Sequence, residues 1–542
     1  MYRVLGNASN PAWRWDPRTQ ACQPALTVDE VSGRAVVRLM SLVDLLRNAD
    51  QVLALSGSTA GEDVAVFEYL MAILYSSDHV PTSHEEWRRW VEGQESLSPA
   101  ADWLAGEPDD RWDLFHPEQP LGQNAELAPF LDGHGVGHAQ VVIERAGDYH
   151  QFFDKSHLHD PEPMRPDVAL RAMLAQHAYG LGGRAMAKAD WLGPQLTYQA
   201  VGRLGSRIRV IAMGPTLGDT LRLNLVPGRD RQPTFNYSWT DGRRRRRTFR
   251  SGKEPRLPDG RADLHSFLGR SILLRPVLVD GRLMVDRVLM AAGELLAPLP
   301  PAYLQDAVLT RSGNYEGPLR PSADRAVWQE AHALYAAAAD RFKGADLYDR
   351  LADLPDRTVN LWAVGLVARK SAAVTWVSDS FPYTSGLQVD LKWAADEGSA
   401  MCEYAAKALW SAAATAREAA YPNAKSADRK PQTARFNGSR EMWAGAAAPF
   451  HALLDSVNAN QRPDAGPLEA FGREIRTTTR NALRSRLASL PPGERGLRAR
   501  FQAETRLKQM LNAEKCPAYL KGSPDDCSTA ATGTAGPHRG GW

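Results

Sequence analysis

Apolar residues in the first 380 positions recur with two different periods. Val64 to Tyr75 has helical spacing behind a polar turn at 56–61, and Trp87, Trp90 and Val91 fall on one face of a second helix. Helical spacing returns at 326–342. Partial alternation and β-branched residues predict strands at 137–144, 207–226, 271–279, 283–290 and 359–377. Residues 1–380 are therefore predicted to form one mixed α+β domain.

The pattern changes after Pro382. Four helical stretches are predicted at about 387–420, 432–458, 466–490 and 494–515, with Pro- and Gly-containing separators. Alanine-rich segments favour helix, and four antiparallel helices with short connections form a bundle. The fold class is thus α+β, with a large mixed N-terminal domain (1–380) and an all-α four-helix bundle (387–516). The Gly/Ser/Pro/Thr-rich segment 517–542 has little to bury and is predicted to be a disordered tail.

Composition is that of a soluble protein. The chain has 542 residues, 43% hydrophobic and 24% charged, without an apolar run long enough for a membrane span or a signal peptide. Four cysteines without a CxxC pair favour a reducing cytoplasm. The net charge is +2, but residues 387–520 hold 20 basic and 14 acidic residues. This excess indicates either a local contact with a polyanion or a solvated helical surface.

Motifs for catalysis are not visible. The sequence contains no Walker loop, HExxH, GxSxG or dinucleotide fingerprint, so no catalytic residue and no cofactor is predicted. One polar loop allows another interpretation, because His-x-His with flanking carboxylates can bind zinc or manganese. This loop contains Asp154, His157, His159 and Asp160. A metal-dependent nuclease therefore remains an alternative. His116 and Glu118 are instead expected to be structural, in a turn fixed by proline spacing.

Several segments, in order, resemble the CasA family, the large subunit of the type I-E Cascade complex, an RNA-guided bacterial antiviral assembly. The most specific is Asp113-Leu-Phe-His-Pro117. The other matching segments are 40–50, 152–160, 179–183, 221–227, 319–328 and 493–511. The resemblance implies a large mixed domain followed by a four-helix bundle, in agreement with the pattern above.

The resemblance also implies a function. Such a subunit recognises the protospacer-adjacent motif on target double-stranded DNA, helps to start unwinding and R-loop formation, and docks the helicase–nuclease effector. The implied partners are the other Cascade subunits, the CRISPR guide RNA, the target duplex and that effector, with no membrane. The subunit is not an enzyme. A purely structural scaffold subunit is the other alternative.

The family's glycine loop, whose backbone approaches the minor groove, matches Gly180, Gly182 and Gly183. Glycine suits this because a side chain would hold the backbone away from base edges. Arg184 stands where the family often has another glycine, so it either contacts phosphate or obstructs the approach. The alternative is an ordinary helix C-cap turn.

A second element of the family is a short hairpin that props base pairs apart, commonly with glutamine at its tip. The matching tip here carries Arg369, Lys370 and Ser371, and no glutamine. Long cationic side chains can insert between bases or hold phosphate. The alternative is an exposed hairpin tip with solvated charges.

Three further regions are assigned more weakly. A basic loop matches only as a region; its residues are Arg243, Arg244, Arg245, Arg246, Arg247 and Lys253. It would contact phosphates without sequence preference, or be an ordinary charged loop. Tyr149, Phe152 and Phe153 match a segment that contacts the rest of Cascade near the end of the guide RNA, or they belong to the domain's own core.

In the bundle, four arginines recur at three- and four-residue steps and so share one helical stripe. They are Arg473, Arg476, Arg480 and Arg484. Such a stripe can follow a DNA backbone, and the alternative is a solvated face that balances acidic residues.

Overall fold

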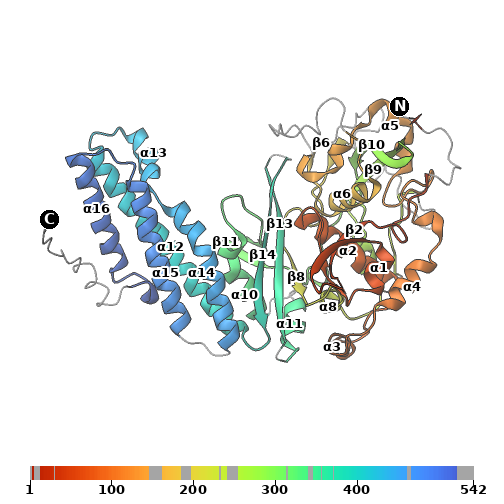
Figure 1. Ribbon diagram of the computed structural model, residues 1–542, viewed down its shortest axis with the longest axis horizontal. Coiled ribbons are helices and arrows are strands. Elements are labelled where there is room, and N and C mark those ends of the chain that lie inside the picture. Colours follow the sequence, from red (N-terminus) through yellow and green to blue (C-terminus); the bar gives the residue numbers. More distant parts are fainter. Residues whose placement is uncertain are drawn as a thin grey trace, which may run out of the picture. The chain divides into compact units, whose positions relative to one another are not determined.

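The computed structural model describes most of the chain. The described residues are 3–4, 13–29, 31–145, 162–184, 197–230, 233–240, 254–312, 315–339, 346–355, 357–369, 372–460 and 465–521. The chain divides into two compact units, which are described separately (Figure 1). The first comprises Met1–Val327 and Asp340–Phe381, and the second comprises Trp328–Ala339 and Pro382–Trp542.

The largest described sheet of the first unit is built on a long antiparallel hairpin, β9 (Arg270–Val279) and β10 (Arg282–Ala292). Asp280 and Gly281 connect the strands with φ angles of 49° and 76°. Two left-handed residues of the Asp-Gly type are what a tight two-residue hairpin turn requires. The predicted strands 271–279 and 283–290 are confirmed by this hairpin.

Further strands complete this sheet and form the other sheets of the unit. The order of the largest sheet is β1-β9-β10-β5, with β1 at Arg3–Val4 and β5 at Val136–Gly137. The remaining strands are β2 (Gln23–Val28), β3 (Ala35–Met40), β4 (Val52–Leu55), β6 (Gly183–Arg184), β7 (Tyr198–Gln199), β8 (Arg209–Met213), β11 (Leu309–Ser312), β12 (Tyr315–Pro318), β13 (Thr358–Arg369) and β14 (Ala372–Thr384). They form sheets in the orders β3-β2-β4, β14-β13-β8, β11-β12 and β6-β7.

Two helices of this unit are buried almost all round, α2 (Ala60–Ser76) and α6 (Pro166–Tyr179), as expected of core helices. The side chain of Thr59 accepts a hydrogen bond from the Glu62 amide and caps α2. The predicted helix at 64–75 is thereby confirmed. The other helices are α1 (Leu42–Arg47), α3 (His84–Gly93), α4 (Ser98–Gly106), α5 (Ala128–His134), α8 (Leu217–Asn224), α9 (Arg261–His265) and α11 (Asp346–Ala352).

Two strand predictions are wrong. Residues 217–224 form helix α8, because Thr216 caps the helix by accepting from the Asp219 amide, and helical spacing buries Leu217 and Leu221. The alternation of leucines and polar residues predicted a strand with one exposed face, but the polar residues between the leucines are buried too. At 137–144, only Gly137 belongs to a strand, and the chain then turns in two short 3₁₀ helices, His138–Val141 and Ile143–Arg145.

The second unit is helical, as predicted. Its helices are α10 (Ala331–Ala339), α12 (Gln388–Ala420), α13 (Ser426–Phe436), α14 (Ser439–Asn460), α15 (Ala465–Leu487) and α16 (Glu494–Leu511). The long helices α12, α14, α15 and α16 pack on one another. Small residues on α12 allow this close packing: a Cβ added at Gly398 would lie 2.9 Å from the ring of Phe450 on α14.

Three boundaries in this unit differ from the predicted ones. The helix predicted at 432–458 is two helices, broken at Asn437 and Gly438, where a Cβ on the glycine would meet the Ala482 backbone at 2.7 Å. Helix α10 clusters with this unit although it precedes residue 380. Residues 517–521 are ordered, with Leu520 buried in the 3₁₀ helix Ala518–Leu520, and the rest of the predicted tail lies outside the described residues. Within the described ranges, none of the helices combines the length and apolar character needed to cross a bilayer.

Candidate nucleic-acid interface

The glycine loop follows α6 directly. Gly180 is the C-cap of that helix, with φ −43° and ψ 139°, so the chain leaves the helix in an extended conformation. Gly183 and Arg184 then form β6, which pairs with β7. The amide of Gly202 donates to the Gly180 carbonyl at 2.7 Å and fixes the start of the loop. The side chain of Arg184 is exposed.

Each glycine of this loop has a local reason. A Cβ at Gly180 would lie 2.5 Å from Nη2 of Arg270, and one at Gly182 would lie 2.8 Å from Cγ2 of Val201. Gly183 has φ 154°, which disfavours other residues. Packing and backbone conformation therefore account for these glycines without a ligand.

The family motif around Asp113 is a structural bridge. The Asp113 carboxylate accepts from the amides of Trp15 and Phe115, and burial raises the pKa of this carboxyl. Nδ1 of His116 accepts from the amides of Glu118 and Gln119, which makes the turn expected from the proline spacing. The most recognisable sequence of the chain thus serves folding.

The segment that follows this motif contacts α6, the helix that leads into the glycine loop. On α6, Nε2 of His177 lies 2.9 Å from the Gly122 carbonyl, while Nδ1 accepts from the Arg270 amide at 3.3 Å. These contacts require a neutral imidazole with its hydrogen on Nε2. Burial lowers the pKa of His177 to about 4, in agreement with that form.

The predicted wedge lies at the turn of a long hairpin, β13–β14 (Figure 1). Arg369 ends β13 with an exposed side chain, whereas Lys370 and Ser371 lie outside the described residues. Further down the hairpin, Trp376 packs edge-on against Tyr179, the residue before the glycine loop, with ring centroids 4.8 Å apart. Nε1 of Trp376 also donates to Glu144. The hairpin and the helix of the glycine loop are therefore held together.

Other predicted site residues lie outside the described part of the chain. They are Tyr149, Phe152, Phe153, Arg243, Arg244, Arg245, Arg246, Arg247 and Lys253. The candidate metal ligands Asp154, His157, His159 and Asp160 also lie outside it. Among the residues that are described, no three His, Cys, Asp or Glu side chains are grouped so as to hold a metal ion.

The predicted arginine stripe on α15 is only partly a surface. Arg473, Arg480 and Arg484 are exposed, and Arg484 lies 3.7 Å from Glu504 on α16. Arg476 is buried, since its relative exposure is 6%. At about 100° per residue, Arg476 is turned about 60° from Arg473 toward the buried face of the helix. Arg476 is therefore not part of an exposed backbone-contacting stripe.

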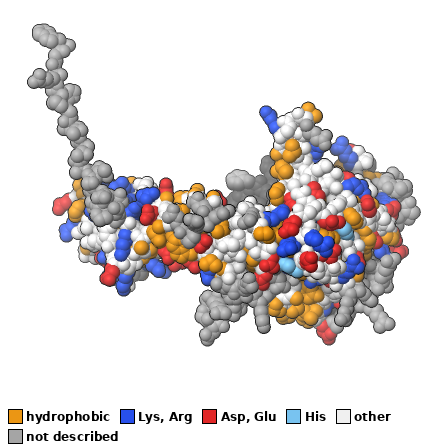
Figure 2. All heavy atoms as spheres, turned by 90° about the horizontal axis from the view of Figure 1, so that it is seen from below, with side chains coloured by type: hydrophobic (Ala, Val, Ile, Leu, Met, Phe, Trp, Pro, Cys, Tyr) orange, Lys and Arg blue, Asp and Glu red, His pale blue; other side chains and the backbone are white. Residues whose placement is uncertain are grey.

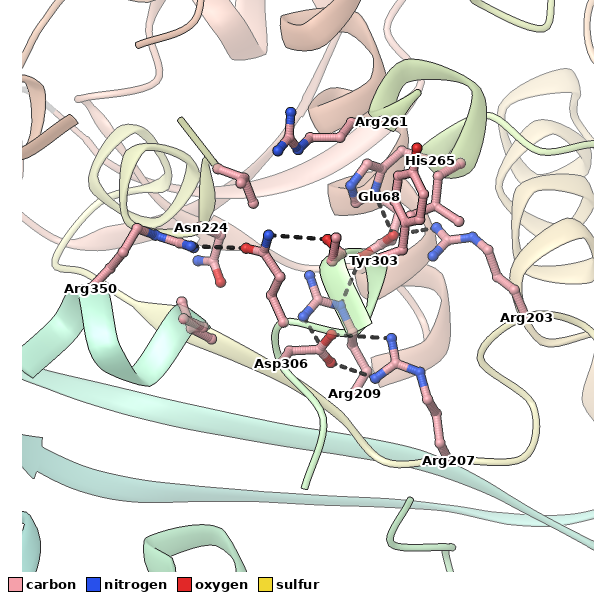
Figure 3. Close-up of a pocket in the computed structure, with 15 residues that line it drawn as sticks. Glu68, Arg203, Arg207, Arg209, Asn224, Arg261, His265, Tyr303, Asp306 and Arg350 are labelled. Carbon is pink, nitrogen blue, oxygen red and sulfur yellow. Dashed lines mark hydrogen bonds and ion pairs between the residues drawn. The ribbon is translucent and has the colours of Figure 1, made fainter. Parts of the chain in front are cut away.

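A pocket rich in arginine lies in the first unit, with an empty volume of about 490 Å³ that includes open solvent (Figure 3). Three arginines share two carboxylates there. Glu68 pairs with Arg203 and Arg209, and Asp306 pairs with Arg207 and Arg209. The dashed lines in Figure 3 show this network joining side chains from distant parts of the sequence.

Both carboxylates of the pocket are ionised at neutral pH. Burial alone would raise their pKa values, but the surrounding cations outweigh burial. The pKa of Glu68 is therefore well below its usual value and that of Asp306 is about 2. Because the carboxylates already occupy the guanidinium groups, the network serves to join segments and is not assigned a ligand.

Figure 2 shows one face of the molecule, where Lys and Arg side chains are interspersed with Asp and Glu. Mixed charge on this face agrees with the small net charge of +2. On this face the charges therefore do not form a continuous basic surface. Sequence analysis located the glycine loop and the hairpin tip by resemblance, but it did not identify Arg270, which lies 89 residues from Leu181 of the loop and carries no motif.

Comparison with known proteins identifies the family. A sequence model of CRISPR-associated protein Cse1 matches residues 24–484. A search of curated protein sequences gives no match.

Several solved structures are similar over nearly their whole length. CasA from Thermus thermophilus superposes with a TM-score of 0.74 at 18% identity, covering 92% of this chain and 99% of that one. Cse1 from Acidimicrobium ferrooxidans gives 0.70 at 21% identity, with 92% and 98% covered. A chain of a CRISPR RNA-guided surveillance complex gives 0.69 at 18% identity, with 91% and 99% covered. At these identities the likeness establishes the fold. Because the family model also spans most of the sequence, this chain belongs to the Cse1 (CasA) family of CRISPR-associated proteins.

Proposed function

We propose that this chain is the large subunit of a type I-E Cascade complex and recognises the protospacer-adjacent motif on target duplex DNA. In this role it helps to start unwinding and R-loop formation and docks the helicase–nuclease, without catalysing a reaction itself. Family membership supports the subunit role, and one similar chain belongs to a CRISPR RNA-guided surveillance complex. Guide RNA and the other Cascade subunits are then its partners.

The observation that carries the proposal is the contact between Trp376 of the hairpin and Tyr179 beside the glycine loop. Ala372, at the start of β14, is four residues from Trp376, or about 13 Å along a strand. A duplex rises about 3.4 Å per base pair, so this span corresponds to about four base pairs. One short stretch of duplex can therefore meet both elements, which suits reading a tag and opening the adjacent pairs.

Two exposed cations flank this arrangement, Arg184 after the glycine loop and Arg369 at the hairpin turn. Phosphate contacts from such side chains position a duplex, while the backbone of the glycine loop approaches the bases. The minor groove presents a degenerate pattern, so this mode predicts tolerance of several related tags.

The test is tag-library binding by the complex reconstituted with guide RNA and the other subunits. We expect Gly182→Asp and Arg369→Ala each to weaken binding of tagged duplex about tenfold or more, while assembly persists. Gly93→Asp and Arg282→Ala are matched controls, since Gly93 has open space around it and Arg282 is an exposed arginine beside another hairpin turn. Gly182→Ala separates the packing cost against Val201 from the loss of DNA contact.

Other results would replace the proposal. Unchanged binding by both site variants rejects these sites. Assembly without any preference among flanking tags indicates a pure scaffold. Cleavage of DNA by the isolated chain with manganese indicates the metal-dependent nuclease.

A further inference from the structure

Arg270 is a buried cation that has no counter-charge among the residues that the structure describes. Its relative exposure is 1%, and no charged group in the described part of the chain contributes to its pKa, which burial alone shifts. Its Nη1 donates to the Gly269 carbonyl at 2.8 Å, and its Nε has no hydrogen-bond partner within the described ranges. Burial lowers the pKa of Arg270 to about 10, so the side chain is still charged at neutral pH. Buried charges are normally paired, because leaving water without a partner is costly.

The remaining contact of this guanidinium points to its role. Nη2 of Arg270 donates to the carbonyl of Leu181, inside the glycine loop, at 2.8 Å. The same group fills the space that a side chain at Gly180 would need. The backbone of Arg270 is fixed as well, since its amide donates to His177 and its carbonyl accepts from Trp239. A rigid cation is thus held directly behind the loop.

We propose that Arg270 is the positioning residue of the glycine loop: it fixes the Leu181 carbonyl, and the phosphates of bound duplex DNA balance its charge. This inference rests on the proposed function. Turning the Leu181 carbonyl toward Arg270 orients the adjoining peptide groups of the loop. A charge in a low-dielectric setting is also screened less by salt than a surface arginine, so it favours an anion at the loop.

The proposal differs from a purely structural role in what it predicts for stability. An uncompensated buried charge is costly, and an apolar side chain of similar size removes that cost. We therefore expect Arg270→Met to keep or raise the Tm of the full chain. The control is Arg222→Met, because Arg222 is fully buried but paired with Asp50 and Asp219. This control should lower the Tm.

Hydrogen exchange of the amides at 181–184 tests the positioning directly in the full chain. We expect Arg270→Met to raise their exchange about tenfold or more, since a charged hydrogen bond is lost. Arg222→Met should leave them unchanged. Unchanged exchange in Arg270→Met, or a loss of Tm as large as that of Arg222→Met, would overturn the proposal.

DNA binding by the reconstituted complex tests the second part of the proposal, that phosphates of the bound duplex balance the charge of Arg270. We expect Arg270→Met to reduce the affinity ratio between tagged and untagged duplex about tenfold. Arg270→Lys keeps the charge but cannot serve both carbonyls, so its overall duplex affinity should exceed that of Arg270→Met while its ratio falls. Equal overall duplex affinity of Arg270→Met and Arg270→Lys would overturn the proposal that phosphates of the duplex balance the charge of Arg270. Arg270→Met could also speed hydrogen exchange at 181–184 but leave the affinity ratio between tagged and untagged duplex unchanged. That result would support the positioning of the loop by Arg270 and refute tag reading by this loop.

Discussion

The indole of Trp376 packs edge-on against the phenol ring of Tyr179, with an interplanar angle of 88°. Edge-to-face pairs of this kind add a favourable contribution beyond the burial of their surface. The contact joins the hairpin β13–β14 to the last residue of α6. It therefore connects the two elements that the proposed function requires to act on the same duplex.

A double-mutant cycle tests the placement of Trp376 through its second neighbour, Gly61 at the start of α2. Trp376 also covers Gly61, where an added Cβ would lie 2.0 Å from the indole ring. We expect Gly61→Ala to lower the free energy of unfolding by about 1–3 kcal/mol through overpacking. Trp376→Ala should cost on the order of 2 kcal/mol. In the Trp376→Ala background, Gly61→Ala should be neutral or stabilising by about 0.5–1 kcal/mol, because alanine favours helix. Urea unfolding measures all four proteins, and additive effects would refute the contact between Trp376 and Gly61.

His177 predicts a loss of stability in mild acid. Its pKa is about 4 in the folded chain and about 6.5 when unfolded. The unfolded chain therefore takes up the proton first, so stability present above pH 6.5 is lost as the pH falls toward 4. The loss from this group is on the order of 3 kcal/mol. Urea unfolding between pH 4.5 and 7.5 should show a flatter profile for His177→Gln, and parallel profiles would contradict the assignment.

The network of the arginine-rich pocket predicts a large effect from a single carboxylate. Glu68→Gln leaves Arg203 and Arg209 with one shared anion fewer, and should cost about 3–5 kcal/mol of stability. Glu92→Gln is the control, because this exposed residue only approaches Arg88 at 3.8 Å and should cost less than about 0.5 kcal/mol. Thermal unfolding compares the two, and similar shifts would mean that the network does not stabilise the fold.

Sequence reasoning predicted elements where one local pattern decides the structure, and failed where distant contacts decide. The Asp280-Gly281 turn fixes its hairpin locally, so both strands were predicted. Helix α8 was missed because its buried polar residues imitate alternation; Arg222, for example, is satisfied by Asp50, 172 residues away. Arg270 carries no signal at all, since its partner Leu181 is 89 residues distant. The glycine loop was located by family resemblance, but the reason for Gly180 is visible only in three dimensions.

The bundle offers a last prediction, on the salt dependence of DNA binding. Replacing the exposed Arg473, Arg480 and Arg484 with glutamine should reduce the slope of log K against log salt by roughly 2–3, if each side chain contacts one phosphate. Arg476 is left in place because it is buried. The matched control removes three other exposed charges by replacing Lys425, Arg429 and Lys430, at the start of α13, with glutamine. The complex should then retain its slope, since these residues lie on another helix. An equal change in both triple variants would indicate a nonspecific effect of net charge. No change in either would show that the stripe on α15 is a solvated face.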